Sequence, residues 1–108
     1  MIFINAKMTV KDAHLDSFLE QVSDYTEACR AEDGNLWFEW YRSADEPNVF
    51  LLSEGFTDEG AEAHVKSEHF KRGLETMRPL LAKTPDIISR QVDGNGWDKM
   101  GELQIDER

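Results

Sequence analysis

The order in which strand-like and helix-like apolar patterns follow one another constrains this chain most. β-prone apolar runs lie at residues 2–8, 36–42, 49–56 and 85–92. Between them, residues 12–31 carry apolar side chains at the three- and four-residue spacing of one amphipathic helix, and a second helical region runs from Thr57 to Pro85. This β-α-β-β-α-β order predicts an α+β, ferredoxin-like protomer, in which an antiparallel sheet carries both helices on one face.

The second helical region is predicted to break near its middle. Thr57 is a good N-cap residue, and Asp58 follows it where the helix dipole favours negative charge. Ser67 is also an N-cap type and is followed by Glu68. We therefore expect a kink or a restart of the helix near residues 66–68.

The strands carry apolar side chains on both faces, because neighbouring residues in a strand point in opposite directions. Residues 2–4, 36–38, 49–52 and 87–88 all show this pattern. Two helices on one side can cover only one face of the sheet. We therefore expect a second copy of the chain to cover the other face by two-fold symmetry, giving a homodimeric α/β barrel.

A tail follows the last strand after the turn-forming residues 93–96. The sequence predicts one domain over residues 1–93 and a separate tail over residues 94–108. The tail has too little apolar surface to order itself, since its apolar residues are only Trp97, Met100, Leu103 and Ile105. We expect it to cross to the partner subunit and bury Trp97 there, and a frayed terminus is the alternative.

Charge and cysteine content exclude several classes of protein. The chain has 12 Lys and Arg against 22 Asp and Glu, a formal net charge of -10. This argues against nucleic acid as a partner and against binding to anionic membranes, since both need basic residues. Cys29 is the single cysteine, so no internal disulfide is possible. With no apolar run of the ~18 residues that a membrane span needs, we expect a cytoplasmic protein.

Three motifs between residues 34 and 70 stand out. Gly34-Asn35-Leu36 opens a strand, Asp45-Glu46-Pro47-Asn48-Val49-Phe50 lies in the hairpin, and His64-Val65-Lys66-Ser67-Glu68-His69-Phe70 lies in the second helical region. Together with Asn5 on the first strand, they resemble the antibiotic biosynthesis monooxygenase family, specifically its quinol-monooxygenase-like members. The resemblance covers about residues 1–93 and implies a dimeric α/β barrel.

This resemblance implies several functions, because the fold carries more than one. The first is a cofactor-independent monooxygenase that oxidises a small aromatic quinol, phenol or anthrone-like substrate with O2. Such a reaction needs a base, donors for an oxyanion and a dry aromatic pocket. The alternative is a small-metabolite binder or an isomerase of the autoinducer-processing type. A phosphorylated ligand needs cationic donors, and Lys66 and Arg72 flank the histidine motif.

His64, His69 and Asn5 are the predicted catalytic residues. Imidazoles titrate near pH 7, but two histidines five residues apart would lie about 140° apart on a continuous helix, so they share a pocket only if the helix restarts. We favour His64 as the proton acceptor, facing the sheet and approaching Asn5, with His69 orienting the substrate or capping the helix. Both histidines could instead simply pack at the break, and Asn5 could tie strands together.

The predicted substrate-binding residues are mostly aromatic: Trp37, Phe38, Trp40, Glu54 and Phe70. Alternating aromatic residues in a strand also serve as plain core, so a subset is expected to line the pocket. Glu54 lies inside a strand, where burial would raise the pKa of its carboxyl group and make it useful in proton transfer.

We expect no metal and no organic cofactor. The histidines lack the His-Glu-x-x-His spacing that places two imidazoles on one helix face, and Cys29 lies on the other helix. The haem-degrading branch of the resembled family has a Trp where His64 stands and its iron-binding His where Leu74 stands, which argues against haem. No glycine fingerprint for a dinucleotide is present.

Overall fold

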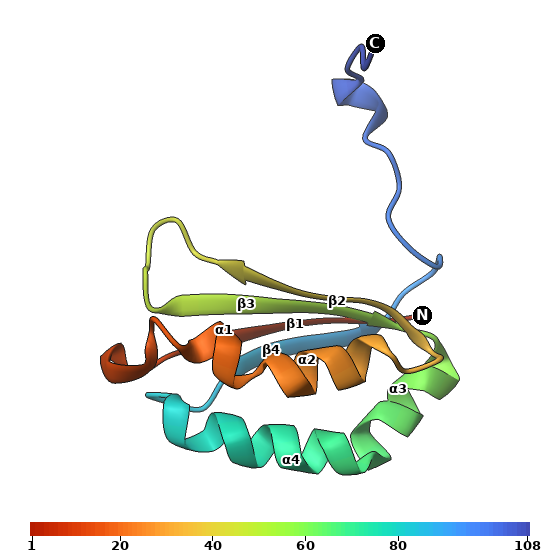
Figure 1. The fold of residues 1–108 in the computed structure, drawn as a ribbon. Coiled ribbons are helices and arrows are strands. Elements are labelled where there is room, and N and C mark those ends of the chain that lie inside the picture. Colours follow the sequence, from red (N-terminus) through yellow and green to blue (C-terminus); the bar gives the residue numbers. More distant parts are fainter.

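The computed structural model describes residues 1–108 and contains one four-stranded antiparallel sheet (Figure 1). The strands are β1 (Ile2–Thr9), β2 (Asn35–Arg42), β3 (Val49–Phe56) and β4 (Asp86–Gln91). They lie side by side in the order β2-β3-β1-β4. The predicted ferredoxin-like α+β fold is confirmed, with β2 and β3 as the hairpin and β4 at the far edge.

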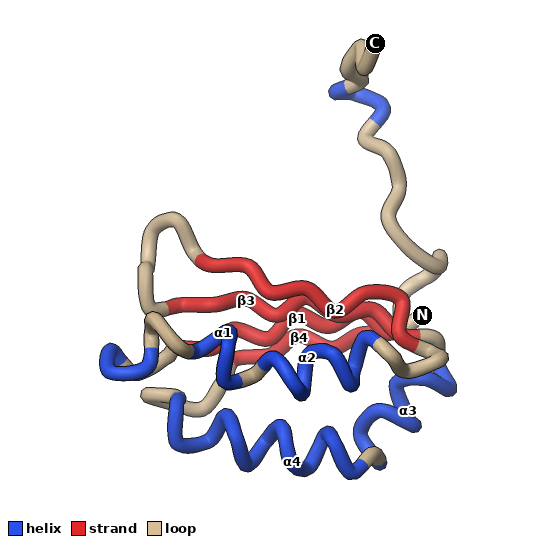
Figure 2. The backbone as a smooth tube through the Cα atoms, viewed as in Figure 1, coloured by secondary structure: helices blue, strands red, loops and turns tan.

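The helices all lie on one face of this sheet (Figure 2). They are α1 (Phe18–Gln21), α2 (Ser23–Arg30), α3 (Asp58–Lys66) and α4 (Glu68–Met77), with short 3-10 turns η1 (Asp12–His14) and η2 (Arg78–Leu80). A third 3-10 turn, η3 (Gly101–Leu103), lies in the C-terminal tail, away from these helices. None of these helices is long and apolar enough to cross a membrane.

The prediction of one continuous helix over residues 12–31 is wrong. The chain forms η1, α1 and α2 there, and Val22 between the two α-helices has φ −99° and ψ 8°. Ser23 Oγ donates a 2.7 Å hydrogen bond to the carbonyl oxygen of Glu20. Serine side chains that bond to nearby backbone in this way compete with regular helical hydrogen bonding, which accounts for the irregularity.

The predicted restart of the second helical region is confirmed at Ser67. Its backbone is extended, with φ −75° and ψ 152°. The hydroxyl caps α4 by accepting a 3.2 Å hydrogen bond from the Phe70 amide, and it donates a 2.7 Å bond to the carbonyl oxygen of His64 at the end of α3. Thr57 caps α3 as expected, accepting a bond from the Gly60 amide.

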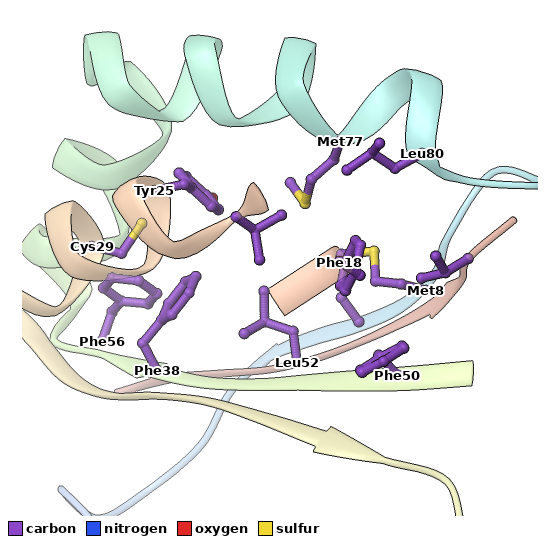
Figure 3. Close-up of a cluster of buried hydrophobic side chains, with 13 residues drawn as sticks. Met8, Phe18, Tyr25, Cys29, Phe38, Phe50, Leu52, Phe56, Met77 and Leu80 are labelled. Atoms are coloured by element: carbon purple, nitrogen blue, oxygen red, sulfur yellow. The ribbon is translucent and has the colours of Figure 1, made fainter. Parts of the chain in front are cut away.

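The core fills the space between the helices and the inner face of the sheet (Figure 3). Even-numbered residues of β1, β2 and β3 point into it, among them Met8, Phe38 and Phe56. The other buried members of the cluster are Ala6, Val10, Phe18, Val22, Tyr25, Cys29, Phe50, Leu52, Met77 and Leu80.

The outer face of the sheet carries no helix (Figure 1). Odd-numbered residues of β1 and β3 point to this side, where Asn5 is paired with Ser53, and Trp37 Nε1 donates a 3.0 Å hydrogen bond to Ser53 Oγ. Tyr41 is 51% exposed and Ile88 is 59% exposed. As predicted from the strand pattern, apolar side chains therefore occupy both faces.

After β4 ends at Gln91, the tail extends away from the domain on the side of the outer face (Figure 1). Gly94 has φ +99°, a left-handed conformation that favours glycine and turns the chain out of β4. The Trp97 ring packs against Trp37 of the same chain, with 5.3 Å between ring centroids. Trp97 is still 72% exposed.

Candidate functional site

Both histidines of the helix break contact the same carboxylate, that of Glu32. His64 Nδ1 lies 2.8 Å from Glu32 Oε2, and His69 Nε2 lies 2.7 Å from the same oxygen. The second oxygen of Glu32 lies 3.2 Å from His64 Nδ1. The extended backbone at Ser67 makes this possible, because a continuous helix would hold the two imidazoles about 140° apart. The predicted shared pocket of the histidines is thus built around a third residue.

Glu32 lies in the loop after α2, and a close backbone contact docks that loop on α3. The Thr57 amide donates a 2.9 Å hydrogen bond to the carbonyl oxygen of Gly34. A Cβ atom added to Gly60 would lie 2.6–2.8 Å from backbone atoms of Gly34. The absence of side chains at both glycines therefore lets the loop approach α3 closely enough for Glu32 to reach His64.

Gly60→Ala is expected to destabilise the domain by about 1–3 kcal/mol, because the new methyl group would overlap rigid backbone rather than a flexible side chain. Chemical denaturation monitored by circular dichroism measures this change. Gly101→Ala is the matched control, since nothing lies within 4 Å of a Cβ at that position. Equal stability of the two variants would contradict the docking role of Gly60.

Glu54 extends this cluster on the side of the sheet. It points inward from β3, is 6% exposed, and its Oε1 lies 3.7 Å from His64 Nε2. Burial, and secondarily the negative charge of Glu32, raise the pKa of Glu54 to about 8. The carboxyl group is therefore mostly protonated at neutral pH and can act as a proton donor towards His64.

The surroundings of His64 are aromatic and dry. The centroid of its ring lies 4.6 Å from the ring centroid of Phe56 and 5.0 Å from that of Phe70. The ring centroids of Phe38 and Tyr25 lie 6.3 Å and 6.4 Å away. Burial raises the pKa of the Tyr25 hydroxyl well above its usual range, so this phenol stays protonated. Hydrogen bonds in such low-dielectric surroundings are stronger than in water.

The two histidines differ in their access to solvent. The side chain of His64 is 4% exposed and that of His69 is 22% exposed. His69 lines a depression of about 210 Å³ between α2 and α4, together with Tyr25, Arg72 and Gly73. Glu32 lines a second depression, of about 530 Å³, on the side of α3. The carboxylate–histidine cluster thus lies between two surface hollows.

The contacts define which ring nitrogens carry hydrogen. An ionised carboxylate only accepts hydrogen bonds, so the nitrogens that face Glu32, Nδ1 of His64 and Nε2 of His69, are its donors. In a neutral imidazole the other nitrogen then has a free lone pair. For His64 that nitrogen faces Glu54. The same arrangement of carboxylate and imidazole orients the general base in hydrolase triads.

The structure brings together only part of the predicted site. His64, His69, Glu54, Phe38 and Phe70 meet around the helix break.

Three other predicted site residues lie elsewhere. The expected approach of His64 to Asn5 is wrong, because Asn5 and Trp37 point to the outer face whereas Glu54 and His64 lie on the inner side. Trp40 points inward but donates its Nε1 hydrogen to Thr26 Oγ1 at 2.9 Å, away from the histidines.

Sequence reasoning missed Glu32 and separated Cys29 from the histidines. In the folded chain one donor atom from each of Cys29, Glu32, His64 and His69 lies within 4.8 Å of the others. A thiolate, a carboxylate and two imidazoles form a donor set that suits zinc, so these four residues are the ones that could hold a metal ion. Burial raises the pKa of the Cys29 thiol, which disfavours the thiolate that a metal ion would need, and both imidazoles already contact Glu32.

Sequence comparisons with a family model and with known proteins agree with one another. A family model described as "Antibiotic biosynthesis monooxygenase" matches residues 1–76. The protein named "Putative monooxygenase YcnE" from Bacillus subtilis (strain 168) is 27% identical over 93 residues, which cover 85% of this chain and 98% of that protein. "Putative monooxygenase GME11364" from Pestalotiopsis microspora is 28% identical over 103 residues, covering 92% of this chain and 86% of that protein.

Solved structures share the fold. A structure described as "Putative antibiotic biosynthesis monooxygenase from Nitrosomonas europaea" superposes with a TM-score of 0.76 at 26% identity, covering 85% of this chain and 98% of that one. A similar protein from Deinococcus radiodurans has a TM-score of 0.79 at 17% identity, covering 94% of this chain and all of that one. The second likeness concerns the fold alone.

Proposed function

This chain belongs to the antibiotic biosynthesis monooxygenase family, and on that premise we propose that it oxidises a small aromatic quinol, phenol or anthrone-like substrate with O2, without a cofactor. The observation that carries this proposal is the pair of histidines that share Glu32, of which His64 is enclosed by aromatic rings and His69 reaches a surface depression. Such a pair supplies the oriented base that the reaction needs.

The proposed reaction uses the substrate as its own reductant. A dihydroxyarene gives up a hydroxyl proton to the base, and the resulting anion transfers an electron to O2. The two radicals combine to a peroxide, which loses water and leaves a new carbonyl group. The dihydroxyarene thus loses two hydrogens and gains one oxygen atom, and the second oxygen atom of O2 leaves as H2O.

Burial favours His69 over His64 as the group that meets the substrate. His69 lines the depression between α2 and α4, whereas the His64 side chain is enclosed by aromatic rings and both carboxyl groups. In the proposed mechanism Nδ1 of His69 accepts the substrate proton, and Glu32 stabilises the imidazolium that forms. His64 donates to the same carboxylate from the other side and keeps it in place.

A second candidate function rests on Arg72. Its side chain lines the same depression as His69, and its guanidinium has no carboxylate within 4.0 Å. A free guanidinium beside a histidine could bind the phosphate of a small metabolite, which fits a binder or isomerase of the autoinducer-processing type. Lys66, the other predicted cation, is instead paired with Glu62 at 2.7 Å.

Oxygen uptake with a panel of dihydroxynaphthalenes and anthrones tests the proposal. We expect turnover without added metal, haem or flavin and in the presence of a chelator, and we expect His69→Ala to lower the rate by roughly 10²–10⁴-fold. His14→Ala, in η1 and outside the site, is the matched control and should retain the wild-type rate.

Two results would overturn the proposal. Activity that a chelator abolishes and a divalent metal restores would assign the site around Cys29 and Glu32 to a metal ion instead. Inertness towards the whole panel, combined with a thermal shift on addition of a phosphorylated sugar, would favour the second candidate function.

A further inference from the structure

We propose that four side chains around the helix break form a binding site for a zinc ion, and that zinc bound there inhibits the protein rather than serving as its cofactor. The four ligands are Cys29, Glu32, His64 and His69. The site follows from the positions of these side chains, whereas its inhibitory effect rests on the oxidation proposed above, in which His69 is the base.

The positions of the donor atoms are close to those around one tetrahedral ion. One donor atom from each of the four residues lies within 4.8 Å of the others. The imidazole nitrogens that face Glu32 lie 2.8 Å and 2.7 Å from the same carboxylate oxygen. Ligand atoms that surround zinc in a tetrahedron lie roughly 3.3–3.8 Å from one another. Small rotations of the side chains therefore place all four atoms around a single ion.

The charges of the four ligands balance a divalent ion. A thiolate and a carboxylate carry one negative charge each, and the two imidazoles are neutral, so bound Zn²⁺ is neutralised by its own ligands. Burying an ion costs far less when its charge is balanced in this way. Burial keeps the Cys29 thiol protonated in the metal-free protein by raising its pKa, so the ion must displace that proton into solvent. This displacement weakens the binding, and we therefore expect a chelator to remove the ion.

Glu54 supports the site from behind His64. A histidine that binds a metal ion through one ring nitrogen normally directs the other nitrogen at a carboxylate or a carbonyl oxygen. Nδ1 of His64 faces Glu32, and Nε2 lies 3.7 Å from Oε1 of Glu54. Glu54 thus lies where the carboxylate that orients a metal-binding histidine is expected.

The site is enclosed but has a path to solvent. Cys29 is fully buried, whereas the side chains of Glu32 and His69 are 13% and 22% exposed. Glu32 lines the depression of about 530 Å³ beside α3 together with Asp33 and Glu59. Three acidic side chains therefore line this depression, and their negative potential attracts a cation towards the ligands.

Zinc at this position prevents the proposed proton transfer. The ion takes the lone pair of His69 Nε2, so the ring hydrogen must move to Nδ1. Nδ1 is the atom that accepts the substrate proton in the proposed mechanism, and it has no lone pair once it carries hydrogen. The ion also occupies the carboxylate of Glu32, whose charge would stabilise the imidazolium. Zinc therefore removes the base and its partner together.

Binding of Co²⁺ tests the site without any substrate. Co²⁺ occupies the same tetrahedral sites as Zn²⁺, absorbs visible light there, and gives an additional charge-transfer band when a thiolate is a ligand. We expect one equivalent of Co²⁺ to produce both signals and Zn²⁺ to abolish them. Cys29→Ser should lose the charge-transfer band, and His69→Gln should weaken Co²⁺ binding by at least roughly 10-fold. His14→Ala, a histidine outside the site, is the control and should bind as the wild type does.

Two results would overturn the zinc site. The first is a wild-type protein that gives no tetrahedral Co²⁺ spectrum. The second is His69→Gln with the wild-type affinity for Co²⁺, because the ion would then bind elsewhere. His69 is the most exposed of the three ligands with polar side chains, so this variant decides the question even if Cys29→Ser does not fold.

Oxygen uptake tests the inhibition. We expect Zn²⁺ to lower the wild-type rate and excess chelator to restore it. Cys29→Ser should turn over like the wild type without zinc, because the thiol has no part in the proposed oxidation, and it should need roughly 10–100-fold more zinc for half-inhibition. Equal sensitivity of the two proteins to zinc would overturn the inhibitory role. A wild type that is inert towards every substrate but gives the Co²⁺ signals would overturn the oxidation and its inhibition, and would support the zinc site.

Discussion

Glu32→Gln is expected to lower oxygen-dependent turnover by roughly 10²–10⁴-fold while leaving the domain folded. The wild-type carboxylate accepts hydrogen bonds from both His64 and His69. A glutamine has one carbonyl oxygen and one NH2 group, so one of the two imidazoles would face a donor instead of an acceptor. That imidazole must turn or exchange its ring hydrogen, and the negative charge that stabilises an imidazolium is lost in either case.

Two measurements separate this positioning role from a general structural one. The ¹⁵N chemical shifts of the imidazoles report which nitrogen carries hydrogen, and we expect them to change in Glu32→Gln. Glu27→Gln, an exposed position on α2, is the matched control and should alter neither the shifts nor the rate. A Glu32→Gln protein with wild-type turnover per folded molecule would show that Glu32 does not orient the base.

The free energy of unfolding is expected to fall as the pH rises from about 4.5 to about 8, because of Glu54. Burial, together with the charge of Glu32, raises the pKa of Glu54 from 4.5 to about 8 in the folded chain. Between these pH values the folded state holds a proton that the unfolded state has released. The contribution is therefore fully present below pH 4.5 and is lost as the pH passes through 8. This contribution to the free energy of unfolding is on the order of 3–5 kcal/mol, because each unit of difference between the folded and unfolded pKa corresponds to about 1.4 kcal/mol.

Urea denaturation at a series of pH values measures this effect. Glu54→Gln mimics the protonated acid and should remove most of the slope, whereas Glu39→Gln, on an exposed side chain, should keep it. Glu32→Gln should reduce the slope in part, because the charge of Glu32 is the second cause of the raised pKa. An unchanged slope in Glu54→Gln would show that another group carries the pH dependence.

The carboxylate of Glu32 also explains why only part of the site could be predicted from the sequence. The restart at Ser67 was predictable, because a cap residue followed by an acid is a local pattern, and with it came the meeting of His64 and His69. Glu32 precedes His64 by 32 positions and His69 by 37, and no spacing rule connects them. Only the close contact of Gly34 with Gly60 places it there.

The face of the sheet on which a strand residue lies is a second property that the sequence alone did not determine. Alternation along β1 separates Asn5 from Ala6 and Met8, but it does not say which set faces the helices. That choice depends on how β1 pairs with β3 and on what α2 and α4 bury. Asn5 therefore lies on the outer face. Glu54 is also a polar residue within a strand, but it lies on the inner face beside His64.

The sequence by itself determined the order of the elements, the caps at Thr57 and Ser67, the apolar character of both sheet faces and the family motifs. These properties depend on local propensities and on periodicity, which residues a few positions apart decide. The tertiary structure alone decided that Glu32, Glu54 and Cys29 surround the histidines. Such contacts depend on how whole elements dock, and docking depends on close packing between surfaces that are far apart in the chain.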